Sequence, residues 1–286
     1  MGLAWVVCSG AVRAIPWYLC VSLALACAAP SAGTASRESA ACVLDAQPEF
    51  IPVPEPIEGE LNEAFDLPDS PEWWVPAPMD SEREQYRAAL VSRLGGEQGL
   101  QPRVLLERQR AVHVALPGDR AREAENIDAL LQGKAGTLGA ASCLEWRLFQ
   151  RQAHRFPMLG RPTELGAYVL RGHGRIRVYL SGADRVGGKL RHEVRDRVVA
   201  DVAQGFAPVA HLHNHPFMFD RKPGDRTWAT EDTLQDIAGA LAPSLTDVQA
   251  YRGMREHFGL QGAWVTNGLD SAHYSAEDFE RLSAWP

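Results

Sequence analysis

The sequence has few of the features that mark several large classes of protein. It holds five cysteines in 286 residues, and neither Cys42 nor Cys143 stands in a spacing typical of a metal site. Its formal net charge of −7 gives no general electrostatic attraction for nucleic acid or anionic lipid. No internal repeat is present, which argues against a solenoid or a propeller. Nucleic-acid binding and repeat architectures are therefore not expected.

The composition that is present is typical of a globular protein. Hydrophobic residues make up 45% of the chain and charged residues 23%, so the chain can bury a core. The length suits one large domain or two small ones.

Residues 1–28 predict a targeting segment. A single charged residue, Arg13, comes before the apolar run AIPWYLCVSLALACAA, which is shorter than the roughly 20 residues that span a bilayer. Ala26-Cys27-Ala28 is a candidate cleavage site for a signal peptide, and LALAC is also similar to a lipoprotein site at Cys27. An uncleaved anchor helix is the third alternative. All three predict export, to a periplasmic, secreted or lipid-anchored location, with membrane attachment through the N-terminus in the last two.

The next two regions carry little sign of chemistry. Residues 29–80 predict a linker rich in proline and acid, because closely spaced prolines forbid long helices and interior strands. Residues 81–142 predict a helical region of unknown role, with a helix from Asp80 or Ser81 to about Leu94 and a loop of small residues over 134–142. Cys42 and Cys143 either form a disulfide in an oxidising compartment or are unrelated thiols.

Residues 143–286 alternate between helical and strand patterns. CLEWRLFQRQAHRF places Leu144, Leu148 and Phe149 at helical spacing. ELGAYVLR and RIRVYLSG, joined by GHG, predict a β-hairpin, and PVAHLHNHP predicts a strand that runs into a loop. DVQAYRGMREHF predicts an amphipathic helix, and GAWVTNG a short strand with a turn. The fold class is therefore α/β or α+β, built around one mixed sheet.

Three histidines and a distant aspartate predict a metal site. His211, His213 and His215 occupy alternate positions, which share one face of a strand. Two imidazoles on one face suit a zinc ion, and Asp247, at the start of a predicted helix, is a natural third ligand. Two histidines and one carboxylate leave the fourth tetrahedral position to water, which is the pattern of catalytic zinc.

The HNHP and PSLTD segments resemble the JAMM motif of the JAB/MPN metalloprotease superfamily, with wording closest to its RadC-like bacterial branch. The motif runs from a glutamate through His-x-His-Pro to Ser-x-x-Asp, and so matches His213, His215, Ser244 and Asp247. Glu164 matches the glutamate. Glu145 is the second choice, because it lies on the preceding amphipathic helix, where a solvent-facing position is expected.

The resemblance implies a cytidine-deaminase-like mixed sheet flanked by helices over residues 143–286, and a peptidase or isopeptidase activity. It implies zinc held by His213, His215 and Asp247, with Glu164 as general base and Ser244 as a hydrogen-bond donor to the oxyanion. The implied partner is a peptide or protein substrate. The alternative is a scaffold module of the same fold with a structural zinc.

The sequence departs from the motif between the second histidine and the serine. Residues 217–243 form an insertion that the usual pattern lacks, and we interpret it as a lid, a substrate-selecting loop or an irregular excursion. The insertion also contains acids that compete with Asp247 as ligand: Asp220, Asp225, Glu231, Asp232 and Asp236.

Overall fold

The computed structural model describes residues 42–184, 191–218 and 239–285. The targeting segment, with Arg13, Cys27 and its candidate cleavage site, lies outside these residues, as do all five acids of the insertion. Residues 39–286 form one compact unit. None of the helices in the described parts of the chain is long and apolar enough to cross a bilayer.

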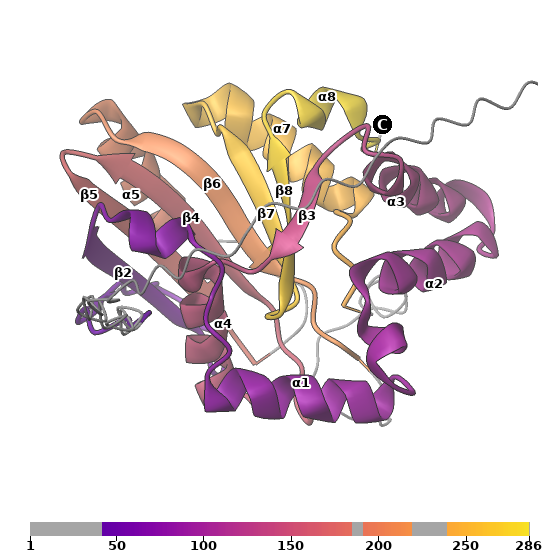
Figure 1. Ribbon diagram of the computed structural model, residues 1–286. Helices are drawn as coiled ribbons and strands as arrows, with labels where there is room; N and C mark the ends of the chain where they lie inside the picture. Colours follow the sequence, from indigo (N-terminus) through magenta and orange to yellow (C-terminus); the bar gives the residue numbers. More distant parts are fainter. Residues whose placement is uncertain (1–41, 185–190, 219–238, 286) are drawn as a thin grey trace, which may run out of the picture. The chain divides into compact units, whose positions relative to one another are not determined.

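The unit is built on one mixed sheet of eight strands (Figure 1). The strands lie in the order β1-β2-β5-β4-β6-β7-β8-β3, and every neighbouring pair is antiparallel except β6 and β7. The parallel pair requires a crossover, which contains helix α7. The strands are β1 (Glu49–Phe50), β2 (Leu61–Pro68), β3 (Thr137–Ala140), β4 (Leu165–Gly172), β5 (Arg175–Gly182), β6 (Ala207–Asn214), β7 (Gly262–Thr266) and β8 (Asp270–Ser275).

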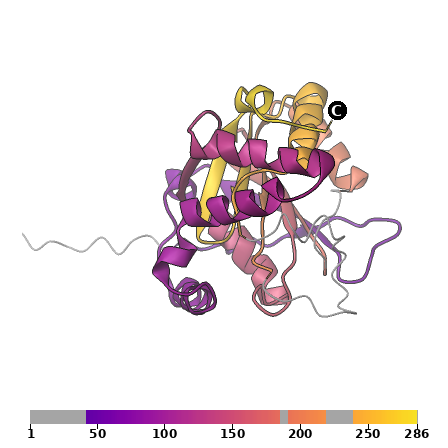
Figure 2. The ribbon, with the colours of Figure 1, turned by 90° about the vertical axis from the view of Figure 1, so that its right-hand side faces the viewer.

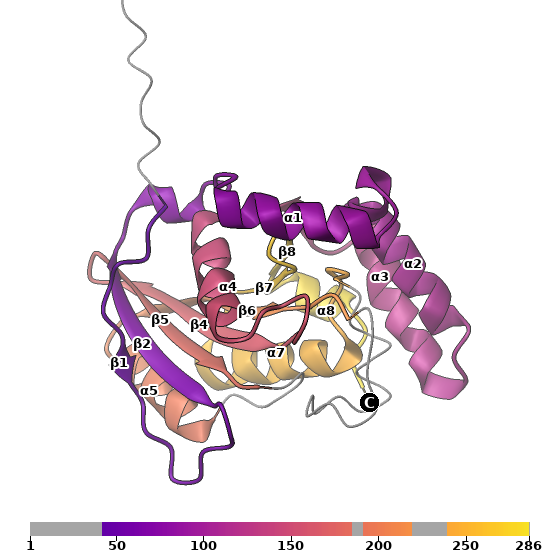
Figure 3. The same cartoon turned by 90° about the horizontal axis from the view of Figure 1, so that it is seen from below.

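Seven α-helices surround the sheet in the described residues. They are α1 (Ser81–Arg93), α2 (Pro102–Val114), α3 (Glu123–Leu131), α4 (Cys143–Arg155), α5 (His192–Ala203), α7 (Leu245–Phe258) and α8 (Asp278–Arg281). Viewed from below, α4 lies on one side of the sheet and α7 on the other (Figure 3). Helices α2 and α3 lie side by side (Figure 2). The expected α/β class with a mixed sheet is confirmed.

Alternation along the central strands supplies a core on each face of the sheet. On β4, Ala167 and Val169 pack with Leu144 and Leu148 of α4. The intervening residues Tyr168 and Leu170 pack in the opposite core, which includes residues of α5 and α7. A central strand covered on both faces is apolar on both faces, and this explains the nearly continuous hydrophobic run of β4.

Two regions contain strands that the sequence did not predict. Residues 61–68 lie in the predicted linker over 29–80, but they form β2, which pairs with β5 along its whole length. The only proline in this strand is its last residue, Pro68, so the backbone N–H groups of the other residues are available for pairing. The predicted loop over 134–142 contains β3, which pairs with β8 as an edge strand.

A disulfide joins Cys42 to Cys143, the first residue of α4. The two half-cystines are 101 residues apart in the chain, and both are buried. Of the two alternatives for these cysteines, pairing is confirmed. The bond fixes the beginning of the described chain to the helix that covers one face of the sheet.

Candidate metal centre

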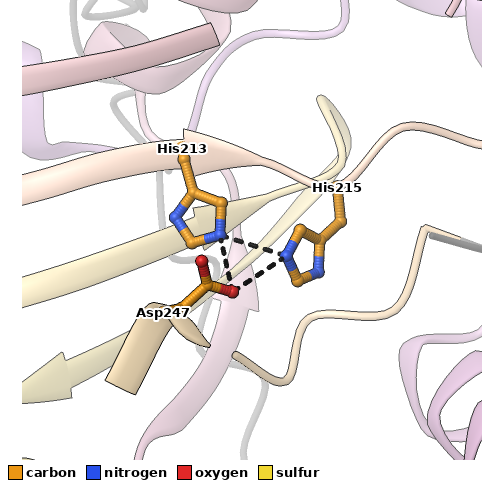
Figure 4. A group of neighbouring side chains, drawn as sticks. All are labelled: His213, His215 and Asp247. Carbon is orange, nitrogen blue, oxygen red and sulfur yellow. Dashed lines mark hydrogen bonds and ion pairs between the residues drawn. The ribbon is translucent and has the colours of Figure 1, made fainter. Parts of the chain in front are cut away.

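The end of β6 presents His213 and His215 on one face of the sheet. Asn214 is the last residue of the strand, and His215 continues its pairing by donating its backbone N–H to the Thr266 carbonyl at 2.9 Å. Pro216 follows and has no N–H to extend the pairing. Both imidazoles are buried, and their Nε2 atoms lie 3.0 Å apart (Figure 4).

The start of α7 presents Asp247 to these imidazoles. Ser244 is the N-cap, and its hydroxyl accepts the backbone N–H of Asp247 at 3.1 Å. In return, Asp247 Oδ2 accepts the Ser244 N–H at 2.9 Å and the Ser244 hydroxyl at 2.8 Å. This reciprocal capping box is typical of a helix start, and here it holds the carboxylate in one orientation.

The three side chains form a triangle with the dimensions of a metal site. Asp247 Oδ2 lies 3.5 Å from His213 Nε2 and 3.6 Å from His215 Nε2. Tetrahedral ligands with bonds of roughly 2.0–2.1 Å are separated by about 3.3 Å from one another. The observed separations surround this value, so one small divalent cation fits between the three atoms.

Hydrogen bonds behind the imidazoles orient their Nε2 atoms for a cation. His215 Nδ1 lies 2.7 Å from the carbonyl of Ala240, which can only accept, so Nδ1 carries the proton. In the neutral ring, Nε2 then has a free lone pair. His213 Nδ1 lies 3.2 Å from the hydroxyl of the buried Tyr251. Support of this kind behind metal-binding histidines is general, and these residues therefore fit zinc.

Burial and charge act in opposite directions on the ionisation of this cluster. Burial raises the pKa of Asp247, but the neighbouring His213 and His215 outweigh it and hold the pKa well below its ordinary value. Burial lowers the pKa of His215, but Asp247 and then Glu164 outweigh it and raise this pKa. The cluster therefore favours one carboxylate with positive charge beside it, which a proton or a metal ion can supply.

Glu164 lies directly before β4 and lines the same cleft as His213 and Asp247. The register brings it there, because Gly166 of β4 pairs with His213 of β6. The side chain of Asn214 holds the peptide groups on either side of Glu164. Its Oδ1 accepts the Leu165 N–H at 2.6 Å, and its Nδ2 donates to the Thr163 carbonyl at 3.1 Å. Asn214 is fully buried, so this clamp is shielded from water.

His211 lies one step before the motif histidines and is buried beside the metal cluster. Its ring contacts Tyr168 edge-on at 5.3 Å between centroids and lies 5.8 Å from the ring of His213. Burial, and then the neighbouring His213, lower its pKa to about 3, so the ring is neutral across the physiological range.

Glu145 was the second choice for the motif glutamate and was expected to face solvent. The expectation of exposure is wrong, because Glu145 is completely buried. It forms the capping box of α4 with Ser142 and lies 3.0 Å from His273 Nε2. Its charge is satisfied there, away from the imidazoles of the metal cluster.

Two supporting residues, Asn214 and Tyr251, were not singled out from the sequence. The sequence contains a signal for Tyr251, which lies four residues after Asp247 and so on the same face of α7. No local signal marks Asn214, because its partners Thr163 and Leu165 are distant in the chain.

Comparison with known proteins finds no matching family model, no matching curated protein and no matching solved structure.

Proposed function

We propose that the chain is a zinc-dependent metallopeptidase or isopeptidase, with a cytidine-deaminase-like fold of the JAB/MPN type. The observation that carries the proposal is the triangle of His213, His215 and Asp247, with Glu164 in the same cleft. The motif residues are brought together from three separate elements, and their spacing suits zinc. The substrate class is a peptide or an amide-linked protein.

The residues of the cluster would hold the ion through His213 Nε2, His215 Nε2 and Asp247 Oδ2. When bound, zinc would supply Lewis acidity, which polarises a carbonyl and lowers the pKa of a water molecule towards 7. Three protein ligands are the number found in catalytic zinc sites, so these residues would leave the ion accessible to solvent.

Glu164 would act as the general base and proton shuttle. Its carboxylate takes a proton from the attacking water, and the same proton passes to the amine as the carbon–nitrogen bond breaks. Asn214 would hold the Glu164 backbone in place during both transfers, since it bonds to the peptide groups on both sides. One water molecule is consumed: its OH ends in the carboxylic acid product and its H in the amine product.

Two roles are open to the Ser244 hydroxyl: it caps helix α7 through Asp247, or it donates a hydrogen bond to the substrate. Its hydroxyl is bonded to Asp247, so its role as N-cap accounts for its position. We keep the proposed role of Ser244 as a hydrogen-bond donor to the oxyanion, which requires that the hydroxyl turn from Asp247 towards the substrate.

An exported location is part of the proposal. The disulfide between Cys42 and Cys143 supports it, because such bonds persist in oxidising compartments. Export would favour a peptide or amide substrate outside the cytoplasm over a ubiquitin-like protein, because ubiquitin-directed relatives of the JAB/MPN type act inside cells.

The proposal is tested by zinc content and peptide cleavage of the wild type and Glu164→Gln. We expect one zinc per chain in both, and a loss of cleavage of about 10²–10⁴-fold in the variant, as is typical of a general base. The control is Asp196→Asn, which changes an exposed acid of α5 outside the cleft and should retain full activity.

Two outcomes would contradict the proposal. Cleavage by Glu164→Gln at the wild-type rate would show that Glu164 is not the general base. A bound zinc with four protein ligands and no cleavage would favour the scaffold module with a structural zinc.

A further inference from the structure

The cleft beside the metal cluster extends well beyond the three ligands. Its volume is about 700 Å³, which is enough for several residues of a peptide. Its walls are formed by the sheet, through β4 and β6, and by the helices α5 and α7. The residues that line it away from the metal cluster include Tyr168, Arg195, His211, Ala250, Met254 and Phe258.

A row of rings lines this cleft away from His213. The His211 ring centroid lies 5.8 Å from that of His213, and the ring of Tyr168, the cross-strand partner of His211, lies 5.3 Å from that of His211. Phe258 then contacts Tyr168 at 5.8 Å. On the facing helix, Ala250 and Gly253 have little or no side chain, which leaves space opposite the rings. This part of the cleft suits an apolar side chain.

Arg195 lies on the wall of the cleft with no partner for its charge. It is exposed, and its side chain makes no hydrogen bond or ion pair within the described residues. Another charged residue of the lining, Glu60, is neutralised by Arg191 through two contacts of 2.7 Å. The positive charge of Arg195 acts on the phenol of Tyr168, where it opposes the effect of burial on the pKa. An anion at this place would meet an unpaired guanidinium.

His211 gives a second and independent indication of a ligand. It lines the cleft and is 8% exposed, and its buried Nδ1 has no hydrogen-bond partner among the residues that the structure describes. Buried polar atoms are nearly always paired, so an unpaired one beside a cleft points to a polar group of a ligand.

We propose that the cleft binds the free C-terminal end of a peptide substrate, with an apolar last side chain against Tyr168 and Phe258 and the α-carboxylate on Arg195. This rests on the proposed peptidase function, because the metal cluster defines where the peptide is cut. A C-terminus lies on the amine side of the cleaved bond, so the segment in the cleft is the leaving group.

The length of the cleft sets the length of that segment. The stretch of the cleft from His213 to His211 spans two residues of β6, at about 3.3 Å for each extended residue, and Tyr168 widens it across the sheet. The proposed reaction is therefore the removal of a short peptide of about two or three residues from a chain that ends in an apolar residue.

The test uses the full chain in its zinc-loaded Glu164→Gln form, which binds peptides without cutting them. Calorimetry compares an acetylated hexapeptide that ends in Ala-Ala-Phe with the same peptide carrying a C-terminal amide. We expect the acid to bind about tenfold more tightly, as is typical of a charge-assisted contact. Arg195→Gln should remove this difference, whereas Arg108→Gln, which changes an exposed arginine of α2 outside the cleft, should retain it.

The outcomes separate this inference from the proposed function. Equal binding of the acid and the amide, no binding of either, or a preference for the acid that survives Arg195→Gln would overturn the inference. If wild type cleaves both peptides equally, only the C-terminal subsite fails. If no zinc binds and nothing is cleaved, but the preference for the acid persists and depends on Arg195, the peptidase function fails and the subsite remains.

Discussion

The starts of α4 and α7 are built in the same way but end in different chemistry. Each has a serine N-cap and an acid three residues later, joined in a capping box: Ser142 with Glu145, and Ser244 with Asp247. Each acid also faces histidine on a strand. A local pattern of serine, acid and histidine therefore occurs twice in one domain.

The distances around the two acids distinguish a structural cap from a candidate metal site. Glu145 Oε2 accepts the Ser142 N–H at 2.7 Å, and its other oxygen meets Ser271 and one imidazole, His273, at hydrogen-bond distance. Asp247 faces two imidazoles at 3.5 and 3.6 Å, which is longer than a good hydrogen bond. Both carboxylate oxygens of Glu145 accept hydrogen bonds, whereas the carboxylate of Asp247 and the two imidazoles are spaced so that an ion fits between them.

The largest expected effect is on zinc binding. Asp247→Asn should lower zinc affinity by more than about 100-fold, because changes behind the ligands alone cost 10–100-fold. Glu145→Gln is the matched change at the other helix start, and it should keep one zinc per chain while lowering stability by about 1–3 kcal/mol. Metal analysis after dialysis and denaturant unfolding measure both. Equal zinc loss in the two variants would break the comparison.

The disulfide is expected to stabilise the α4 side of the domain strongly. Replacement of Cys42 and Cys143 together by serine opens a loop of 101 residues, and loop entropy predicts a loss of about 4–5 kcal/mol in the free energy of unfolding. Zinc affinity of the folded fraction should remain unchanged, because neither cysteine belongs to the metal cluster. A variant that unfolds at the wild-type denaturant concentration would contradict this expectation.

Asn214 distinguishes the α7 site further from the α4 site, because it connects strand β6 to the backbone on both sides of Glu164. Asn214→Ala should lower kcat by up to about 100-fold with little change in KM, since a small misplacement of a catalytic group has this effect. Zinc content should stay at one per chain. Asn214→Asp keeps the acceptor for the Leu165 N–H and should recover part of kcat. A kcat equal to that of the wild type in Asn214→Ala would show that the clamp does not position Glu164.

The smallest expected effect is the pH dependence of the metal-free protein. The raised pKa of His215 stabilises the fold below its unfolded value of 6.5, and this contribution is lost as the pH rises through the folded pKa. The lowered pKa of Asp247 stabilises the fold above 3.8, and this contribution is lost as the pH falls. The cluster should therefore stabilise the metal-free protein most between these two values.

Thermal unfolding across the pH range checks this expectation. Zinc-loaded protein should behave in the opposite way at neutral pH, because protons compete with the metal for the imidazoles. Asp247→Asn should flatten the pH dependence of the metal-free form. A metal-free protein whose Tm is unchanged from pH 5 to pH 8 would contradict the assignment.

Much of the fold was predictable where the pattern is local. Two strand-like runs joined by the GHG turn predicted β4 and β5, the run PVAHLHNHP predicted β6, and helical patterns predicted α4 and α7. Strand β2 was missed because the prolines around it suggested a linker, and β3 because Thr137–Ala140 lies in a run dominated by glycine, alanine and serine, which suggested a loop. Both strands are recruited by pairing with β5 and β8, and partners so distant leave no trace in the segments themselves.

The order of residues was sufficient to name the three side chains that meet in the candidate site, since HNHP puts two imidazoles on one face of a strand and PSLTD puts an acid at a helix start. Long-range packing was needed to bury Glu145 in a capping box of its own and to bring Asn214 onto the backbone of Glu164. Local spacing specifies which way a side chain points, but the few ångströms that separate a filled hydrogen-bond cluster from a cation site depend on how β6 and α7 meet across the domain.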